Sequence, residues 1–481
     1  MSGIPVFSAG TSLQSSGASV SAQIPADSAG MLPLFVRVTA TAAGYFRLSQ
    51  DGASAAIGDL LVQPSDGLIL KTCGLSQFSF VSQSGASTVT VTPIDVGGIK
   101  YPTNIFTPAA LFTAGVNGAW YDPSDFSTMF QDAAGTTPVT AVEQPVGLML
   151  DKSKGLVLGS ELLPNGDFAT SSGWIATNGV TIANGEAVFS SVSSASSLYA
   201  SANLATTPGV WYQLQFTIKS RNAGSIGLRL ASAGGTTPRS YSDPGTYVYR
   251  IAVGTASPSN NFVVFDATGF SGVVDDVSVK AIPGNHAYNP SGNSANFPVL
   301  QQDGTGRYYL SFNGVNQWLQ TNSIDFTYGD KMFVAAGVRK LSDAAAGIFT
   351  ELSANINTNN GAFYIAIPPT AGTFEFSSKG TTPVVVSRSG FAVPISAVVS
   401  LSSDIAAPKF DAKVNTIASA TSTTTQGTGN YGNYPLYIGA RAGSSLWFNG
   451  RLYGLVVAGK AASDSEIAST ETWLNQKTGA Y

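Results

Sequence analysis

Residues 117–153 read NGAWYDPSDFSTMFQDAAGTTPVTAVEQPVGLMLDKS, and the organisation of the whole chain follows from this stretch. The Trp-Tyr pair at Trp120 supplies large apolar surface, and the Asp-Pro pair after it predicts a turn, because the residue before proline avoids the helical region. Phe126, Met129 and Phe130 recur at helical spacing, which predicts one apolar helical turn followed by extended chain. We interpret these aromatic side chains as core and turn residues.

This stretch resembles a segment that recurs in virion proteins of tailed bacteriophages, especially tail-fibre-type appendages. In that family it runs directly into a GNHA segment, a DGxGRYYLxFxG segment and a concanavalin-A-like (laminin-G-like) sandwich. Here the second part lies far downstream, as GNHA at 284–287, FPVL at 297–300 and DGTGRYYLSFNG at 303–314. We therefore predict one parent sandwich, made of 117–154 and 284–481, that is split by an inserted domain at 155–283.

The predicted insert has recognisable ends. It opens with ELLPNGDF at 161–168 and closes with GVVDDVSV at 272–279. This pair of ends resembles jelly-roll carbohydrate-binding modules, whose first and last strands lie side by side, as an inserted domain requires. Apolar and polar residues alternate over 212–218, which predicts a half-buried antiparallel strand.

The second resemblance implies candidate sites in the insert. Some modules of this kind bind a structural calcium ion through an acid just after the NGDF-type motif and an aspartate of the closing strand. Calcium takes about six to eight oxygen ligands, but Ala169 stands where the first acid is expected. Asp167, Asp275 and Asp276 remain the candidate calcium ligands, with water-exposed turn and edge-strand aspartates as the alternative. We expect no other cofactor.

Aromatic side chains exposed on a sheet or a loop are the candidates for stacking against sugars. A Gly- and Asn-rich loop at 426–434, QGTGNYGNY, contributes two tyrosines, and such loops adapt to partners. The alternative for every one of these residues is a place in the core. The candidate carbohydrate-binding residues are Trp211, Tyr212, Tyr241, Tyr247, Tyr431 and Tyr434.

The N-terminal part predicts a separate small module. Residues 1–30 are rich in Ser, Ala and Gly and aperiodic, and they read as an extended arm. Short strands follow over 31–98, and TVTVT at 88–92 alternates at period two, which predicts a small β-sandwich or barrel. By analogy with appendage proteins this is a virion-attachment module, with 99–116 as a linker. We interpret Cys73 as a small buried residue.

Composition supports an all-β fold and excludes several functions. Only 11% of the 481 residues are charged, against about a quarter in ordinary proteins. The net charge is −4 without basic clusters, so we expect no nucleic-acid binding. One cysteine excludes an intrachain disulfide, and one histidine excludes a multi-histidine metal site. The sequence start lacks a signal-peptide pattern, and no apolar run is long enough for a membrane span.

One helix is predicted, near the C-terminus. Ser463 and Glu466 have the spacing of a capping box, Trp473 and Leu474 give an apolar side, and Gly479 suits the C-cap. We expect this helix to pack on the parent sandwich.

The sequence shows no catalytic motif. It has no strand–turn–helix context for a nucleophilic serine and no phosphate-binding loop. His286 lies in the GNHA segment, where the resemblance gives it a structural role. Concanavalin-A-like glucanases carry closely spaced acids in one strand, whereas Glu375 stands alone. Two carboxylates brought together by the fold stay open as an alternative, but we expect no enzyme.

The leading hypothesis is a bacteriophage virion structural protein, a tail fibre or surface decoration protein, made in the host cytoplasm. Its N-terminal module would bind other virion proteins, and its outer domains would bind host cell-surface glycans for host attachment, as a homo-oligomer that is trimeric by analogy. The alternatives are a decoration protein without a ligand and a tailspike-like polysaccharide depolymerase. Neither membrane insertion nor nucleic-acid binding is expected.

Overall fold

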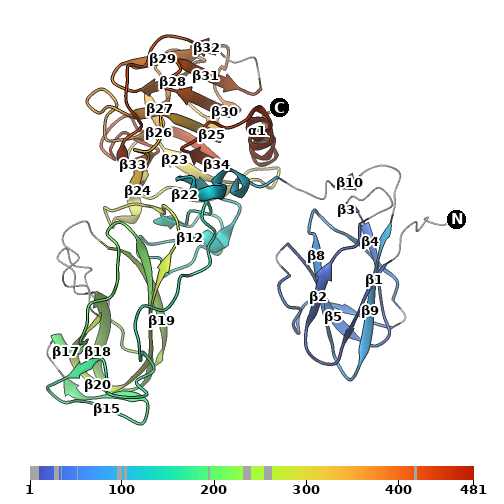
Figure 1. Ribbon diagram of the computed structural model, residues 1–481, viewed down its shortest axis with the longest axis vertical. Helices are drawn as coiled ribbons and strands as arrows, with labels where there is room; N and C mark the ends of the chain where they lie inside the picture. Colours follow the sequence, from blue (N-terminus) through green and yellow to red (C-terminus); the bar gives the residue numbers. More distant parts are fainter. Residues whose placement is uncertain are drawn as a thin grey trace. The chain divides into compact units, whose positions relative to one another are not determined.

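The computed structural model describes residues 10–26, 32–33, 35–50, 52–64, 66–94, 100–101, 106–192, 195–230, 240–253, 263–416 and 420–481. The chain divides into two compact units, Met1–Phe106 and Thr107–Tyr481. As predicted, the fold is all-β: the first unit is a small sandwich, and the second is a larger two-sheet sandwich that carries an inserted β-sandwich (Figure 1).

The first unit is built from short strands. They are β1 (Thr11–Ser15), β2 (Val20–Gln23), β3 (Leu32–Pro33), β4 (Phe35–Ala40), β5 (Gly44–Ser49), β6 (Leu60–Val62), β7 (Leu68–Lys71), β8 (Gln77–Ser82), β9 (Ser87–Ile94) and β10 (Lys100–Tyr101). Two four-stranded sheets, β1-β9-β4-β7 and β2-β8-β5-β6, enclose one core, and β10 pairs with β3. Val36 and Val38 of β4 meet Phe78 and Phe80 of β8 in this core, because alternate residues of a strand face one side.

Three expectations for this unit need correction or fall outside the described residues. Residues 11–15 and 20–23 of the predicted arm are strands that pair with β9 and β8 and complete the two sheets. The interpretation of Cys73 as a buried residue is wrong: it is exposed in a turn, where its φ is positive at 51°. The predicted linker extends into the second unit, where Pro108–Gly115 forms the 3-10 helix η1. Residues 1–9, 27–31, 34, 95–99 and 102–105 lie outside the described residues.

The parent sandwich consists of an eight-stranded and a nine-stranded antiparallel sheet around one large core. Its elements are β11 (Gly118–Tyr121), η2 (Phe126–Thr128), β12 (Met129–Phe130), β13 (Leu148–Met149), β21 (Ala287–Tyr288), η4 (Ser294–Asn296), β22 (Val299–Gln302), β23 (Tyr308–Asn313), β24 (Leu319–Asp325), β25 (Lys331–Lys340), β26 (Gly347–Leu352), β27 (Ala362–Ile367), β28 (Phe374–Lys379), β29 (Pro383–Arg388), β30 (Ile395–Asp404), β31 (Lys409–Val414), β32 (Ala420–Ser422), β33 (Asn433–Ile438), β34 (Asn449–Ala458) and α1 (Asp464–Thr478).

The two sheets follow different paths through the sequence. The eight-stranded sheet runs β22-β23-β34-β25-β30-β31-β32 with β11 on β34, and the nine-stranded sheet runs β12-β13-β21-β24-β33-β26-β27-β28-β29. The predicted helical turn at residues 126–130 is half right. Phe126 starts the short 3-10 helix η2, but Met129 and Phe130 form β12, because they pair with Met149 and Leu148 of β13.

The two halves of the parent sandwich meet at a buried carboxylate. Asp151 is fully buried, and its oxygens accept hydrogen bonds from the backbone N–H groups of Trp120, Ser153 and Asn285 at 2.7 to 2.8 Å and from the Ser153 hydroxyl at 2.7 Å. The Asp151 N–H donates to Nδ1 of His286 at 3.0 Å. This cluster joins the quoted opening stretch to the GNHA segment.

The insert forms a seven-stranded sheet system with a core of its own (green to yellow in Figure 1). Its strands are β14 (Trp174–Ala176), β15 (Val180–Ala183), β16 (Glu186–Val192), β17 (Ala195–Ala200), β18 (Trp211–Leu230), β19 (Gly245–Ala252) and β20 (Val263–Ile282). Its two ends lie side by side, because Gly159 donates to Ala281 O and Leu162 to Val279 O. Residues 193–194, 231–239 and 254–262 lie outside the described residues.

The insert packs directly on the parent sandwich. Trp211 and Ile282 of the insert share an apolar cluster with Phe130, Leu148 and Leu150 of the parent. The Arg250 guanidinium lies 4.2 Å from the Phe130 ring and donates to Gly135 O. This contact covers the start of β18.

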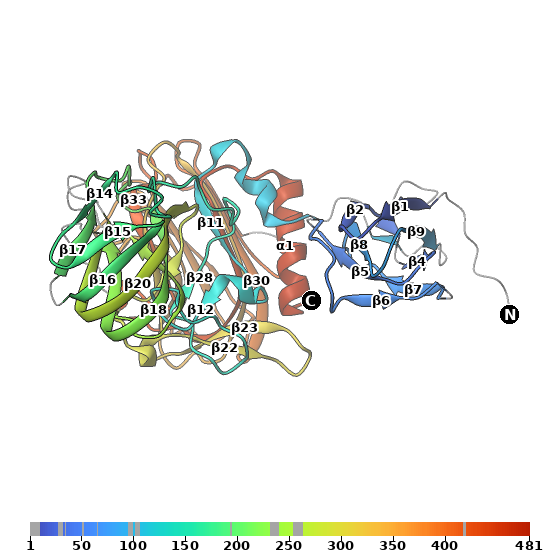
Figure 2. The same cartoon turned by 90° about the horizontal axis from the view of Figure 1, so that it is seen from below.

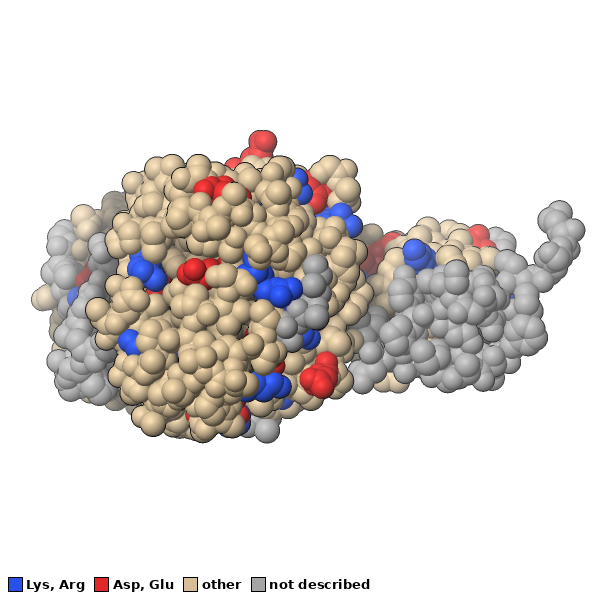
Figure 3. All heavy atoms as spheres, turned by 90° about the horizontal axis from the view of Figure 1, so that it is seen from above, with Lys and Arg blue, Asp and Glu red and all other residues tan. Residues whose placement is uncertain are grey.

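The predicted C-terminal helix is confirmed as α1, with a complete capping box at Ser463 and Glu466 and a left-handed Gly479 at its end. It packs on β25, β30 and β34 on the outer side of the eight-stranded sheet (Figure 2). Acidic and basic residues are interspersed on the face shown in Figure 3. No helix among the described residues is long and apolar enough to span a membrane.

Candidate functional site

The outward side of the nine-stranded sheet carries a row of aromatic and polar residues. Tyr288, Gln320, Tyr437, Glu351 and Tyr364 are successive register partners across β21, β24, β33, β26 and β27. Directly opposed residues of antiparallel strands share one face. Their sequence neighbours, among them Leu319, Leu436 and Phe363, lie in the sandwich core, so this row faces away from it.

A pocket of about 260 Å³ lies on this face, and we call it the sheet pocket. Tyr364, Glu375, Arg441 and Asn357 contribute its polar side chains. Its apolar lining comes from Ala346, Gly347, Ile348, Ala366, Ile367, Pro368, Pro369 and Leu446. One pocket thus offers donors, acceptors and apolar surface together.

Arg441 is fixed by a buried ion pair. Its Nε donates to Oε2 of Glu351 at 2.8 Å, and Glu351 is fully buried. Burial raises the pKa of Glu351, and the hydrogen bond from Arg441 opposes this rise. No described residue accepts a hydrogen bond from the two Nη atoms of Arg441. The guanidinium therefore enters the pocket with its orientation set and two nitrogens available.

Tyr364 and Glu375 form the opposite polar pair. The Tyr364 hydroxyl donates to Oε1 of Glu375 at 2.7 Å, and the Arg441 guanidinium carbon lies 5.9 Å from the centre of the Tyr364 ring. Burial and the bonded carboxylate raise the pKa of Tyr364, so it stays a donor at neutral pH. None of the described residues donates to the other oxygen of Glu375, which is left as an acceptor for a ligand.

An asparagine-rich loop at 353–361 borders the sheet pocket, and two buried charged residues hold it. Glu351 accepts a hydrogen bond from Ile356 N at 2.9 Å. The Lys379 ammonium is nearly buried and donates to Ile356 O at 2.8 Å and to Asn357 O at 3.2 Å. Asn357 is exposed and is thereby placed at the pocket rim.

The aromatic residues predicted from the sequence lie elsewhere. Trp211 and Tyr212 are buried, because the parent sandwich covers the outer side of β18 and the insert core takes the inner side. Tyr431 is buried with its hydroxyl 2.6 Å from that of Ser378. Burial leaves these three rings no free face for a sugar.

The remaining predicted aromatic residues are half-buried. Tyr241 and Tyr247 stack on each other with ring centres 3.9 Å apart and pack against Phe216 of the insert core. Tyr434 packs against the parent core. Their partial exposure keeps these three tyrosines as candidates, but none of them lines the sheet pocket.

The three candidate calcium ligands have different surroundings. Asp275 is buried and its carboxylate pairs with Lys219 at 2.8 Å, while Asp167 and Asp276 are exposed. Within the described residues no group of three or more His, Cys, Asp or Glu side chains is arranged to hold a metal. Backbone carbonyls and water can supply part of a set of about six to eight oxygens, and Asp167 and Asp276 line one hollow, so the calcium site stays a prediction.

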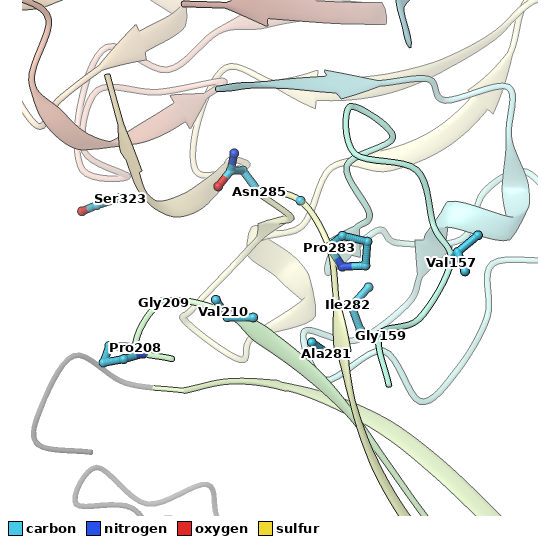
Figure 4. A pocket seen from close by; sticks show the side chains of 11 residues that line it. Val157, Gly159, Pro208, Gly209, Val210, Ala281, Ile282, Pro283, Asn285 and Ser323 are labelled. Carbon is cyan, nitrogen blue, oxygen red and sulfur yellow. The ribbon is translucent and has the colours of Figure 1, made fainter. Parts of the chain in front are cut away.

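Two other hollows are less suited to a ligand. One of 330 Å³ lies where the insert meets the parent sandwich, and Figure 4 shows its lining of Pro208–Val210, Ala281–Pro283 and Val157, with Asn285 and Ser323 as polar side chains. A groove of 570 Å³ borders α1, but its Lys409 pairs with Asp411 at 3.2 Å and its Lys413 with Glu471 at 3.8 Å. Neither contains an aromatic ring.

Sequence reasoning missed the sheet pocket. Arg441 was assigned no role from the sequence, and Glu375 was mentioned only as an isolated acid. Glu351 and Tyr364 meet them through strand register, which the sequence does not show. Tyr364, which stands between Phe363 and Ile365 in the apolar stretch 362–367, was the one available signal.

No protein-family model matches the chain, and no curated protein matches it. Solved structures with partial likeness include the CBM40 of the Ruminococcus gnavus IT-sialidase bound to α2,3-sialyllactose, at 16% identity over 30% of this chain and 83% of that one, with a TM-score of 0.26.

Two further likenesses involve larger proteins. The NanB sialidase from Streptococcus pneumoniae is 19% identical over 34% of this chain and 27% of its own, with a TM-score of 0.26. Botulinum neurotoxin type C is 11% identical over 36% and 44%, with a TM-score of 0.29. Likeness at this level assigns no ligand, so function has to be argued from this chain's own residues.

Proposed function

We propose that the protein binds glycans without cleaving them, and that the sheet pocket holds a saccharide unit. One observation carries this proposal: an acceptor carboxylate, a fixed guanidinium and a phenol ring meet in the sheet pocket at Glu375, Arg441 and Tyr364. A saccharide presents hydroxyl groups that donate and accept, together with apolar C–H faces. Ligand pockets combine such convergent polar groups with apolar walls.

A depolymerase is the second candidate, because Glu351 and Glu375 lie in one cluster. Glycoside hydrolysis needs two carboxylates on either side of the scissile bond. Glu351 is fully buried and held by Arg441 and by Ile356 N, so it has no access to a substrate. This favours binding over cleavage.

We also propose that the protein is a tail fibre or surface decoration protein of a bacteriophage virion. The resemblance of roughly residues 105–155 and 284–481 to virion appendage proteins supports this proposal, as does the charge-poor β composition. The first unit would attach to the particle and the second would meet the host surface. Weak binding at each site would be multiplied by the many copies on a particle. A decoration protein without a ligand is the alternative.

The glycan proposal is tested with the full chain on an array of bacterial surface polysaccharides, scored for binding and for polymer length. Tyr364→Ala should weaken binding about tenfold or more, as loss of a central aromatic contact does. Tyr328→Ala removes the same side chain at a position that is 75% exposed and should change nothing. Absence of glycan binding by the native chain, or equal losses in both variants, would overturn the proposal. Shortened polymer would establish the depolymerase instead.

The virion proposal has its own test. Particles of the phage that encodes the chain are purified by density gradient, and the protein is located on them with gold-labelled antibodies. Labelled particles would support a structural role, whereas particles free of the protein would overturn it.

A further inference from the structure

The charges around the sheet pocket suggest which saccharides it takes, and this step rests on the proposed function. Glu351 and Glu375 bring two negative charges to the cluster, and Arg441 brings one positive charge. Lys379 is close in the fold and keeps its positive charge, because hydrogen bonds to the carbonyls of Ile356 and Asn357 do not neutralise it, but it does not line the pocket. Of the two charged residues that line the sheet pocket, Arg441 is paired with the buried Glu351, whereas Glu375 forms no ion pair with a described residue, so its negative charge is the one that a ligand meets.

Arg441 is not a free counter-charge for an acidic sugar. Its guanidinium is already paired with the buried Glu351 carboxylate at 2.8 Å. A ligand that drew the guanidinium away would leave this carboxylate buried without a counter-charge, which is costly. A ligand carboxylate at Arg441 would also meet Glu375, since Tyr364 bonds to Glu375 and lies 5.9 Å from the guanidinium. Like charges brought together in this way oppose binding.

Glu375 is instead suited to hydroxyl groups. An ionised carboxylate only accepts hydrogen bonds, and one of its oxygens has no donor among the described residues. The Nη atoms of Arg441 and the amide of Asn357 supply donors on other sides of the sheet pocket. A neutral sugar satisfies this set, because each hydroxyl can give a hydrogen to Glu375 and take one from Arg441.

We propose that the sheet pocket selects neutral saccharides and rejects sialylated or uronic ones, and that Glu375 determines this specificity. A volume of about 260 Å³ suits a short terminal segment of a glycan. Specificity of this kind comes from an unfavourable contact with the wrong ligand as well as from good contacts with the right one.

The test uses pairs of oligosaccharides that differ by one terminal sialic or uronic acid. The full native chain should bind the neutral member about tenfold more tightly than the acidic one at low salt. Glu375→Gln keeps the shape and removes the charge, so this ratio should shrink towards one. Glu143→Gln makes the same change at an exposed position outside the pocket and should leave the ratio unchanged.

A second variant guards against a general loss of structure. Tyr364→Phe removes a hydroxyl but keeps the charge of Glu375, so affinity should fall while the ratio stays. Native binding that is equal or stronger for the acidic member, or an unchanged ratio in Glu375→Gln, would overturn this inference and leave glycan binding intact. Failure to bind either member would overturn glycan binding itself and this inference with it.

Discussion

At the scale of single residues, two buried titratable groups sit in contact where the halves of the parent sandwich join. Burial lowers the pKa of His286 from 6.5 to about 3, aided by Arg250. Burial raises the pKa of Asp151 from 3.8 to about 6 against the hydrogen bonds from Asn285, Ser153 and Trp120. The two shifts act on stability in opposite directions.

The signs follow from proton uptake. For His286, the lowered pKa gives stability that is complete above pH 6.5 and is lost as the pH falls towards 3. For Asp151, the raised pKa gives stability that is complete below pH 3.8 and is lost as the pH rises through 6. Acidification from pH 7 should therefore first lower the free energy of unfolding, then leave it nearly level between pH 6 and 3.8, then lower it again.

This first prediction is checked by thermal unfolding of the full chain from pH 8 to pH 3. All six tryptophans lie in the second unit, so their fluorescence reports on that unit alone. His286→Asn keeps an acceptor for the Asp151 N–H but binds no proton. Without the opposing histidine, the variant should gain stability on acidification between pH 6 and 3.8, by about 1.4 kcal/mol per pH unit. Parallel curves for the two proteins would refute the assignment.

Among the secondary-structure elements, helix α1 has the clearest local sequence signal, a capping box at its N-terminus. The Ser463 hydroxyl accepts a hydrogen bond from Glu466 N, and the Glu466 carboxylate accepts one from Ser463 N at 2.8 Å. Ser463→Ala should lower the free energy of unfolding by about 1 kcal/mol, measured by urea titration of tryptophan fluorescence. Ser469→Ala, inside the same helix, should not destabilise the protein, because alanine favours a helix interior. Equal losses would show that the cap does not stabilise α1.

Elements that depend on a local sequence signal could be predicted, whereas features that depend on contacts between distant residues could not. The capping box and the period-two segment at 88–92 are local signals, and both identified their elements, α1 and β9. Strands β1 and β2 were predicted to be part of an extended arm, because their Ser- and Gly-rich sequences carry no apolar pattern. These strands are stabilised by pairing with β9 and β8, which lie far along the chain. The sheet pocket was hidden for a related reason: Glu351, Tyr364 and Glu375 come from three neighbouring strands, and only their register brings them together. Trp211 was misjudged because burial by a second domain leaves no trace in one strand's pattern.

At the scale of the whole molecule, the insert joins the parent sandwich at two neighbouring points. Asp151 bonds to Asn285 N at 2.7 Å, and Gly159 bonds to Ala281 O at 2.9 Å, so the chain leaves and re-enters the parent at nearly the same place. The pairing of β13 with β21 and the Asp151 cluster use no residue of the insert. The parent sandwich should therefore not depend on the insert for its fold.

A variant in which a short Gly-Ser linker replaces residues 155–283 should fold and keep the glycan binding of the sheet pocket. Its free energy of unfolding should fall by about 3 kcal/mol, because Phe130, Leu148 and Leu150 lose their contact with Trp211 and Ile282 and become exposed to water. A matched variant of the intact chain, Trp211→Ala, should lose a similar amount by weakening the same contact. Cooperative unfolding of the shortened chain, followed by tryptophan fluorescence together with a binding assay, checks both statements. A shortened chain without a cooperative transition would mean that the insert is part of the parent's folding unit, and that the apolar contact at β18 is structural for both domains.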